Sequence, residues 1–171
     1  DTGGKNVGDP VLGRIQEAAG YNGKPTVVKR AGFEKALDLD TPNLYRGFAE
    51  PSMLEQYISG EHYPGRGLFG SGTYASVARS IAKRYTSTNS IMRLTYKGTA
   101  KVITYDNLAK EMNSFYKKHK SKVSDKILQS VLGNSGRFAA MRGYDVINVV
   151  GAFNDSQFVI LNRGAAVVLE A

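Results

Sequence analysis

The glycine-dense segment at the centre of the sequence reads Gly65-Arg66-Gly67-Leu68-Phe69-Gly70-Ser71-Gly72-Thr73-Tyr74. Glycine adopts positive φ and lets a backbone approach a ligand closely, and exposed N–H groups before a helix suit anionic or amide groups. From Ser76 to Tyr85 the apolar residues recur about every 3.6 positions, which predicts a helix with Ser76 as its N-cap. Residues 60–72 are therefore predicted to form a loop that leads into a helix and carries a ligand site.

A short strand is predicted before this loop, at Leu44-Tyr45-Arg46-Gly47-Phe48, because its side chains alternate and its arginine stands in the middle. Residues 1–10 read as a tail, and residues 11–43 read as a helical N-terminal layer. The elements expected around the strand are an amphipathic helix at Val11–Ala19, a brief extended piece at Pro25–Val28, a helical turn or two at Gly32–Leu37 and a helix at Ser52–Ile58.

Helices and strands also mix in the second half of the sequence. Ser90–Tyr96 and Thr99–Tyr105 alternate around Lys97-Gly98, which predicts a hairpin or two strands, and residues 106–132 have a helical pattern. A short helix is expected at Arg137–Arg142, strands at Asp145–Val150, Phe158–Asn162 and Ala165–Leu169, and a turn at Phe153–Gln157. Without a regular βαβ alternation, this order favours an α+β fold, and 171 residues suit a single domain over residues 1–171.

Composition removes several classes of site. The absence of cysteine excludes disulfides, thiolate zinc sites and thiol nucleophiles, and two histidines, His62 and His119, are too few for most metal sites, so no metal is expected. No run approaches the ~20 apolar residues of a membrane span, and no membrane partner is expected. Because the sequence opens without a secretion signal at Asp1-Thr2-Gly3-Gly4, we expect a part of a longer protein. The net charge of +8 favours acidic partners, nucleic acid among them.

Three parts of the sequence together resemble the ADP-ribosyltransferase superfamily, both its toxin and effector domains and the NAD site of the poly-ADP-ribose-polymerase type. These parts are Leu44-Tyr45-Arg46-Gly47, then Phe69–Ser76 with Tyr85 eleven residues after Tyr74, and Gln157–Asn162. The resemblance covers residues 44–168. It implies the ADP-ribosyltransferase fold, an α+β architecture with a split core of two β-sheets, flanking helices and NAD in the cleft between the sheets.

The same resemblance implies roles for single residues. Arg46 would contact the nicotinamide-side ribose or phosphate, and the Gly47 backbone would hold the nicotinamide carboxamide. Tyr74 and Tyr85 would lie against the nicotinamide ring, where aromatic faces stabilise a departing cationic group. Ser76 or Ser71 would support the site. The full set expected to bind NAD is Arg46, Gly47, Phe48, Gly70, Ser71, Gly72, Thr73, Tyr74, Ser76 and Tyr85.

One departure from the family concerns catalysis. The family's catalytic glutamate hydrogen-bonds the ribose 2′-hydroxyl and stabilises the oxocarbenium-like transition state, and Gln157 stands at that position. Glutamine keeps the shape but lacks the charge, a loss that commonly costs about 10²–10³ in rate. Asp155 is the candidate stand-in, so the expected catalytic residues are Arg46, Gln157 and Asp155. Gln157 marks either a natural low-activity variant or a deliberate Glu→Gln change.

The resemblance implies a mono-ADP-ribosyltransferase that moves ADP-ribose from NAD to a macromolecular acceptor, protein or nucleic acid. The context it implies is the toxin or effector end of a longer bacterial or phage protein, acting in the cytoplasm of a producer or target cell, with an immunity protein as a candidate partner. Two alternatives stay open. One is a non-catalytic module that binds NAD or ADP-ribose, which Gln157 favours. The other is a basic nucleic-acid-binding accessory domain, which the charge favours.

Arg46 and the lysine-rich segment also have simpler structural interpretations. Arg46 would also fit an ion pair with an acid on a neighbouring strand. The lysines from Lys117 to Lys126 read first as a solvated helix face and second as a groove for phosphates.

Overall fold

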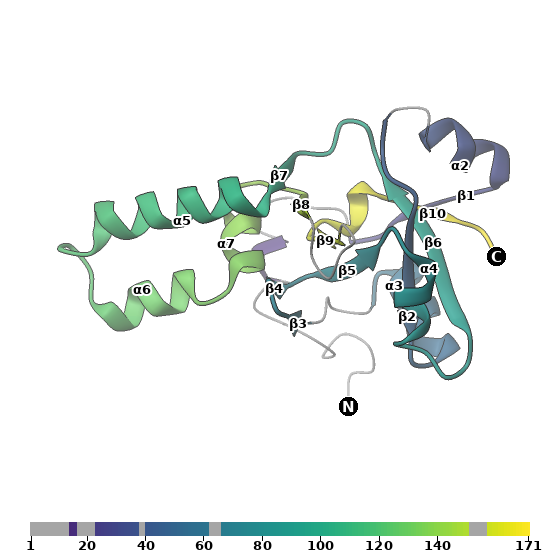
Figure 1. Cartoon of the computed structure of the whole chain (residues 1–171), viewed down its shortest axis with the longest axis horizontal. Coiled ribbons are helices and arrows are strands. Elements are labelled where there is room, and N and C mark those ends of the chain that lie inside the picture. The colour runs from purple at the N-terminus through teal and green to yellow at the C-terminus, as the bar shows by residue number, and fades with distance from the viewer. Residues whose placement is uncertain (1–13, 17–22, 38–39, 62–65, 151–156) are drawn as a thin grey trace.

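The computed structural model describes residues 14–16, 23–37, 40–61, 66–150 and 157–171 (Figure 1). The predicted tail, most of the predicted Val11–Ala19 helix, His62 and Asp155 lie outside these residues. Within them the chain is a mixed α+β protein built on one eight-stranded sheet, which confirms the predicted α+β class. None of the described helices is long and apolar enough to cross a membrane.

The strands of the large sheet follow the order β1-β10-β6-β2-β5-β9-β8-β7. Strands β1 and β10, and strands β7 and β8, are parallel, and the other neighbours are antiparallel. Their bounds are β1 Thr26–Val28, β2 Leu44–Phe48, β5 Thr73–Ser76, β6 Ser90–Tyr96, β7 Val102–Thr104, β8 Val146–Val149, β9 Gln157–Ile160 and β10 Ala166–Leu169. The predicted loop holds a small separate ribbon of β3 (Arg66–Gly67) and β4 (Gly70–Ser71).

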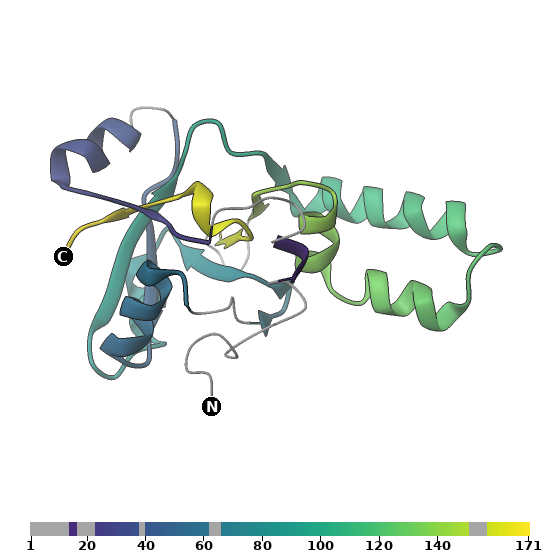
Figure 2. The same cartoon turned by 180° about the vertical axis from the view of Figure 1, so that it is seen from behind.

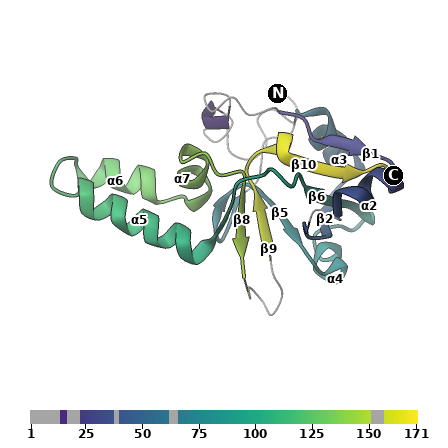
Figure 3. The same cartoon turned by 90° about the horizontal axis from the view of Figure 1, so that it is seen from above.

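The large sheet consists of two halves that meet at one position. Strands β2 and β6 pair through five residues each, and β5 and β9 pair through four. Between the halves, β2 and β5 pair only where Tyr45 lies opposite Ser76. Figure 3 shows β5, β9 and β8 fanning away from β2, β6 and β10. The expected pair of separate sheets is thus one sheet with a split, because this single pair keeps the halves hydrogen-bonded.

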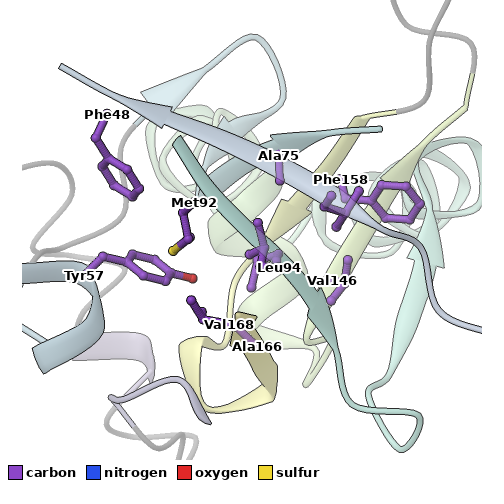
Figure 4. Close-up of a cluster of buried hydrophobic side chains, with 11 residues drawn as sticks. Phe48, Tyr57, Ala75, Met92, Leu94, Val146, Phe158, Ala166 and Val168 are labelled. Atoms are coloured by element: carbon purple, nitrogen blue, oxygen red, sulfur yellow. The ribbon is translucent and has the colours of Figure 1, made fainter. Parts of the chain in front are cut away.

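Side chains on the two faces of the sheet form two cores. Along β9 and the residue after it, Phe158 and Ile160 belong to one cluster and Val159 and Leu161 to the other, as expected from strand alternation. The first cluster, drawn in Figure 4, joins both halves of the sheet to the buried Tyr57. The second cluster lies between the sheet and the helices that follow β7 and precede β8.

The described helices are α2 Arg30–Leu37, α3 Pro51–Ser59, α4 Arg79–Lys83, α5 Tyr105–His119, α6 Asp125–Leu132 and α7 Ser135–Met141, with a 3-10 turn at Arg163–Ala165. Helices α5 and α6 form a hairpin that projects from one end of the sheet (Figures 1 and 2). The prediction of continuous helix over 106–132 is wrong at residues 120–124. There the Ser124 side chain accepts a hydrogen bond from Ile127 N and starts a second helix.

The extended piece predicted at Pro25–Val28 is β1, which lies along β10 at the edge of the sheet. Of the two arrangements predicted around Lys97-Gly98, the structure has two strands and no hairpin, since β6 pairs with β2 and β10 whereas β7 pairs with β8. One other prediction needs correction. Ser76 is no N-cap, because it pairs within the sheet and α4 begins after Ala78, whose N–H donates to Ser76 Oγ.

Candidate functional site

Arg46 lies where the two halves of the sheet separate. It follows Tyr45, the residue that pairs with Ser76, and its Nη1 donates a hydrogen bond of 2.9 Å to the carbonyl oxygen of Tyr74. Beyond this point β2 continues along β6 and β5 continues along β9. The guanidinium therefore connects the halves where backbone pairing has ended.

The described surroundings of Arg46 give its charge no anionic partner. Its guanidinium carbon lies 5.4 Å from the centre of the Phe48 ring, and its Nε is buried without a hydrogen-bond partner among the described residues. No carboxylate in the described part of the chain forms a salt bridge with it. Burial lowers the pKa of Arg46, although an arginine remains protonated at neutral pH. An anion is the ligand that this arrangement would accept.

Helix α4 packs directly against β2 beside Arg46. A Cβ at Gly47 would come within 2.0 Å of the Ala82 carbonyl oxygen, so only glycine permits this approach. Tyr85 follows α4 and is 65% exposed, and its phenol is close enough to act on the charge of Arg46. The structure therefore places Tyr85 just after the helix that packs against Gly47, next to Arg46.

The hydroxyl group of Tyr74 hydrogen-bonds back to the backbone of the glycine-dense segment. The hydroxyl accepts a hydrogen bond of 2.8 Å from Phe69 N and donates one of 2.7 Å to the Gly70 carbonyl oxygen. Burial raises the pKa of Tyr74 to about 12, so the phenol stays neutral. Its ring is half-buried and packs with the second core. Arg46 binds its backbone, while its hydroxyl is engaged within its own loop.

The glycines of this segment have a packing role. At Gly70 (φ 89°) a Cβ would meet Asn134 Oδ1 at 2.4 Å, and at Gly72 (φ 155°) it would meet a Val159 methyl group at 2.3 Å. Asn134 also caps α7, where its Oδ1 accepts from Arg137 N. The protein itself fills the space beside both glycines, so their occurrence is explained without a ligand.

Ser71 and Ser76 have different environments. Ser71 is fully buried, its N–H donates to Asn134 Oδ1, and its Oγ accepts 2.7 Å from Asn134 Nδ2, so it anchors β4 to α7. Ser76 is buried directly opposite Gln157. Of these two serines, Ser76 is the one placed beside the residue expected at the catalytic position.

Gln157 begins β9 and is 7% exposed. It pairs with Ser76 on one side and with Val149 of β8 on the other. Its strand lies next to β5, whose Tyr74 carbonyl binds Arg46. Gln157 thus stands in the half of the sheet opposite Arg46, across the split.

The remaining predicted residues, Phe48 and Thr73, are buried structural neighbours of the site. Phe48 belongs to the first core beneath Arg46. Thr73 is buried beside the phenol of Tyr57.

Neither Tyr57 nor its neighbour Arg163 is among the site residues expected from the sequence. Arg163 is buried, donates 3.0 Å to the Gly60 carbonyl oxygen and lies 5.9 Å from the centre of the Tyr57 ring. Burial raises the pKa of Tyr57. Arg163 therefore lies against a buried phenol on which the charge of Arg46 also acts. In the sequence Tyr57 occupies an ordinary apolar helix position, and nothing there signals its two cationic neighbours.

A pocket of ≈270 Å³ opens where α5 begins. Phe69 and Tyr105 lie in it with their ring centres 4.9 Å apart, and the Oδ1 atom of Asn148 is buried there without a partner among the described residues. Val149, the neighbour of Gln157 in β8, also lines it. The pocket is therefore close to the third part of the predicted site, on the side of the α5–α6 hairpin.

Within the ranges that the structure describes, no group of three or more His, Cys, Asp or Glu side chains is placed to hold a metal ion. A scan against the models of known protein families finds no match to the chain, and a search among curated proteins finds no match either. The geometry around Arg46 is therefore the basis for any statement about function.

Proposed function

We propose that the chain is an ADP-ribosyltransferase domain of the mono-ADP-ribosyltransferase kind, which binds NAD at the split in the sheet. The observation that carries the proposal is Arg46, a cation at the junction of the two halves that has no described carboxylate partner and one buried N–H left over. The diphosphate of NAD supplies the missing negative charge and the missing acceptor. The resemblance of residues 44–168 to this superfamily supports the same function and the superfamily's finer fold.

The other residues have proposed roles that follow from their positions. The Gly47 backbone and the exposed ring of Tyr85 form the nicotinamide end of the site, next to Arg46. Gln157 lies across the split, where its amide hydrogen-bonds the ribose 2′-hydroxyl. In the reaction nicotinamide leaves with the electron pair of the glycosidic C1′–N bond, and an acceptor heteroatom bonds to C1′ and releases its proton.

A second candidate function is a module that binds NAD or ADP-ribose without cleaving it. Gln157 favours this reading, because an amide cannot supply the negative charge that stabilises an oxocarbenium-like transition state. Asp155, the proposed stand-in, lies outside the described residues. The two functions share the same binding site and differ only in turnover.

Substitution Gln157→Glu distinguishes these functions. We expect nicotinamide release from labelled NAD to rise about 10²–10³-fold, because the new carboxylate stabilises charge that develops only in the transition state. The affinity for NAD, measured by calorimetry, should change little. Gln129→Glu, the same substitution on an exposed position of α6, is the control and should leave both quantities unchanged.

Nicotinamide release tests turnover, and calorimetry tests binding of NAD. NAD binding with no gain in release for Gln157→Glu supports the module and overturns the transferase. If neither protein binds NAD, both proposals are wrong.

A further inference from the structure

The far end of the α5–α6 hairpin carries a concentration of positive charge, which we call the basic tip. It is formed by five exposed lysines, Lys117, Lys118, Lys120, Lys122 and Lys126, together with the exposed Tyr116. Figures 1 and 2 show the hairpin projecting away from the sheet, so the tip lies at a distance from the sheet. A partner of the tip therefore has access from several directions.

Neighbouring groups do not neutralise the charge of the tip. None of its five lysines forms an ion pair with another described residue. Asp125 is the one acid between residues 116 and 126. Lys117 and Lys118 stabilise the C-terminal end of α5 through the helix dipole, but Lys122 and Lys126 lie beyond that end and receive no such benefit. The tip is therefore more basic than helix stability requires.

An aromatic ring lies among these lysines. Tyr116 is 41% exposed, which leaves part of its ring open to a stacking partner. Behind it, the Phe115 ring packs 4.4 Å from the ring of His119 and 5.5 Å from that of Phe138 in α7, so this part of α5 is anchored to the protein. Lysines that contact phosphates around an exposed aromatic ring are the features that bind single-stranded nucleic acid.

The hairpin also has a defined reach. Helix α5 has 15 residues and is therefore about 22 Å long. Its first residue, Tyr105, lines the pocket with Phe69 and Asn148, so the helix leads from that pocket to the basic tip. At about 3.4 Å per stacked nucleotide, roughly seven nucleotides cover this distance.

We propose that the basic tip docks single-stranded nucleic acid and directs it along α5 toward the pocket at the base of the helix. The docking proposal depends only on the residues of the basic tip. The further conclusion, that nucleic acid is the acceptor of ADP-ribose, rests on the proposed function. An acidic protein would also meet the lysines, but it would make no use of the exposed ring of Tyr116.

The test measures binding of a labelled single-stranded RNA of about 12 nucleotides by fluorescence anisotropy over a salt series. Five phosphate contacts predict a slope of log K against log salt of about −3.5. The triple variant Lys117→Gln, Lys118→Gln, Lys120→Gln should reduce the size of that slope by about 2 and weaken binding about tenfold or more at low salt.

A matched control removes the same charge elsewhere. Lys29, Lys35 and Lys97 are exposed and lie outside the hairpin, so their triple change to Gln lowers the net charge equally. The control should bind RNA almost as the unchanged protein does. Equal weakening by both triple variants would show a diffuse effect of net charge and overturn the proposal. Urea unfolding curves check that both variants fold.

Stacking is tested at Tyr116. Tyr116→Ser should weaken binding about 5- to 150-fold, whereas Tyr116→Phe, which keeps the ring, should bind as before. Polyglutamate is the competing probe. If it binds as tightly as RNA at equal charge, the partner is an acidic protein and the proposal is wrong.

NAD calorimetry on the same variants separates this proposal from the proposed function. Nucleic-acid binding without NAD binding supports docking at the basic tip and overturns the proposed transferase. NAD binding without nucleic-acid binding supports the NAD site and overturns docking at the tip.

Discussion

Arg46 is a cation that has no carboxylate partner among the described residues. Its side chain is half-buried, and charges withdrawn from water are usually paired, because desolvation of an unpaired one is costly. The described contacts of Arg46 are one hydrogen bond to the Tyr74 carbonyl and the face of the Phe48 ring. These two contacts compensate only weakly for the lost hydration of its charge. A side chain of this kind serves binding more than stability, which leads to a prediction at the level of this residue.

Arg46→Met should separate function from stability. Loss of the hydrogen bond to Tyr74 costs about 1 kcal/mol, and relief of the uncompensated charge acts in the opposite direction. We expect the free energy of unfolding in urea to change by less than about 1 kcal/mol. NAD binding should weaken about 10- to 100-fold, the usual worth of one charge-assisted hydrogen bond.

Arg93→Met on the adjacent strand β6 is the control. Arg93 donates 2.7 Å to Asn43 Oδ1 and lies over Phe33, so its contacts are structural. This variant should bind NAD normally. A strongly destabilised Arg46→Met with unchanged NAD affinity would mean that Arg46 is structural as well.

At the scale of the elements, the contact between β2 and α4 fixes the distance between Arg46 and Tyr85. Gly47→Ala places a Cβ 2.0 Å from the Ala82 carbonyl oxygen and must push α4 away. We expect a destabilisation of about 1–3 kcal/mol, as for other overpacked sites, together with weaker NAD binding.

Gly32→Ala in α2 is the same substitution against a softer neighbour, since the nearest atom to its Cβ is a Val28 side-chain carbon at 3.2 Å. Urea unfolding should place this control within about 1 kcal/mol of the unchanged protein. If Gly47→Ala is equally mild, α4 does not rest on β2 as described.

Local patterns predicted many elements and few of their partners. Alternation located β2, β8 and β10, and helical spacing located α3 and α7, because these patterns depend on neighbouring residues. Pairing is not local. Nothing near Lys97 shows that β6 and β7 belong to different halves of the sheet, and nothing near Tyr45 shows that one residue pair joins those halves.

The same limit applies to the candidate site. Arg46, Gly47 and Tyr85 were predicted from a motif and lie together. The role of Gly70 was not predictable, because its close contacts come from Asn134 and Gly136, far along the chain. Cross-chain packing of this kind leaves no periodic signal in either segment.

At the scale of the whole molecule, several tyrosines link stability to alkaline pH. Burial raises the pKa of Tyr57 and Tyr96, and it raises that of Tyr74 to about 12, from the ordinary value of 10. Above pH 10 the unfolded chain loses these protons first. The contribution of these neutral tyrosines to the free energy of unfolding is therefore fully present below pH 10. It should fall as the pH rises from 10 toward 12.

Urea unfolding at intervals from pH 8 to pH 11.5 measures this fall. Tyr74→Phe removes one contributing group, so its stability should depend less steeply on pH above 10, although it loses the hydrogen bonds to Phe69 and Gly70. An equally steep curve for this variant would show that Tyr74 titrates normally in the folded protein.

The position of β10 bears on how the chain reaches its fold. The strand lies between β1 and β6, with Val167 opposite both Thr26 and Thr95. During synthesis β1 and β6 leave the ribosome long before residues 166–169, so the nascent chain has an open β6 edge and an unattached β1. Closing such a distant pairing is entropically costly and slow, and open strand edges favour aggregation. The growing chain therefore depends on β10 to finish one half of the sheet, and a nascent chain stalled before residue 166 is a substrate for chaperones.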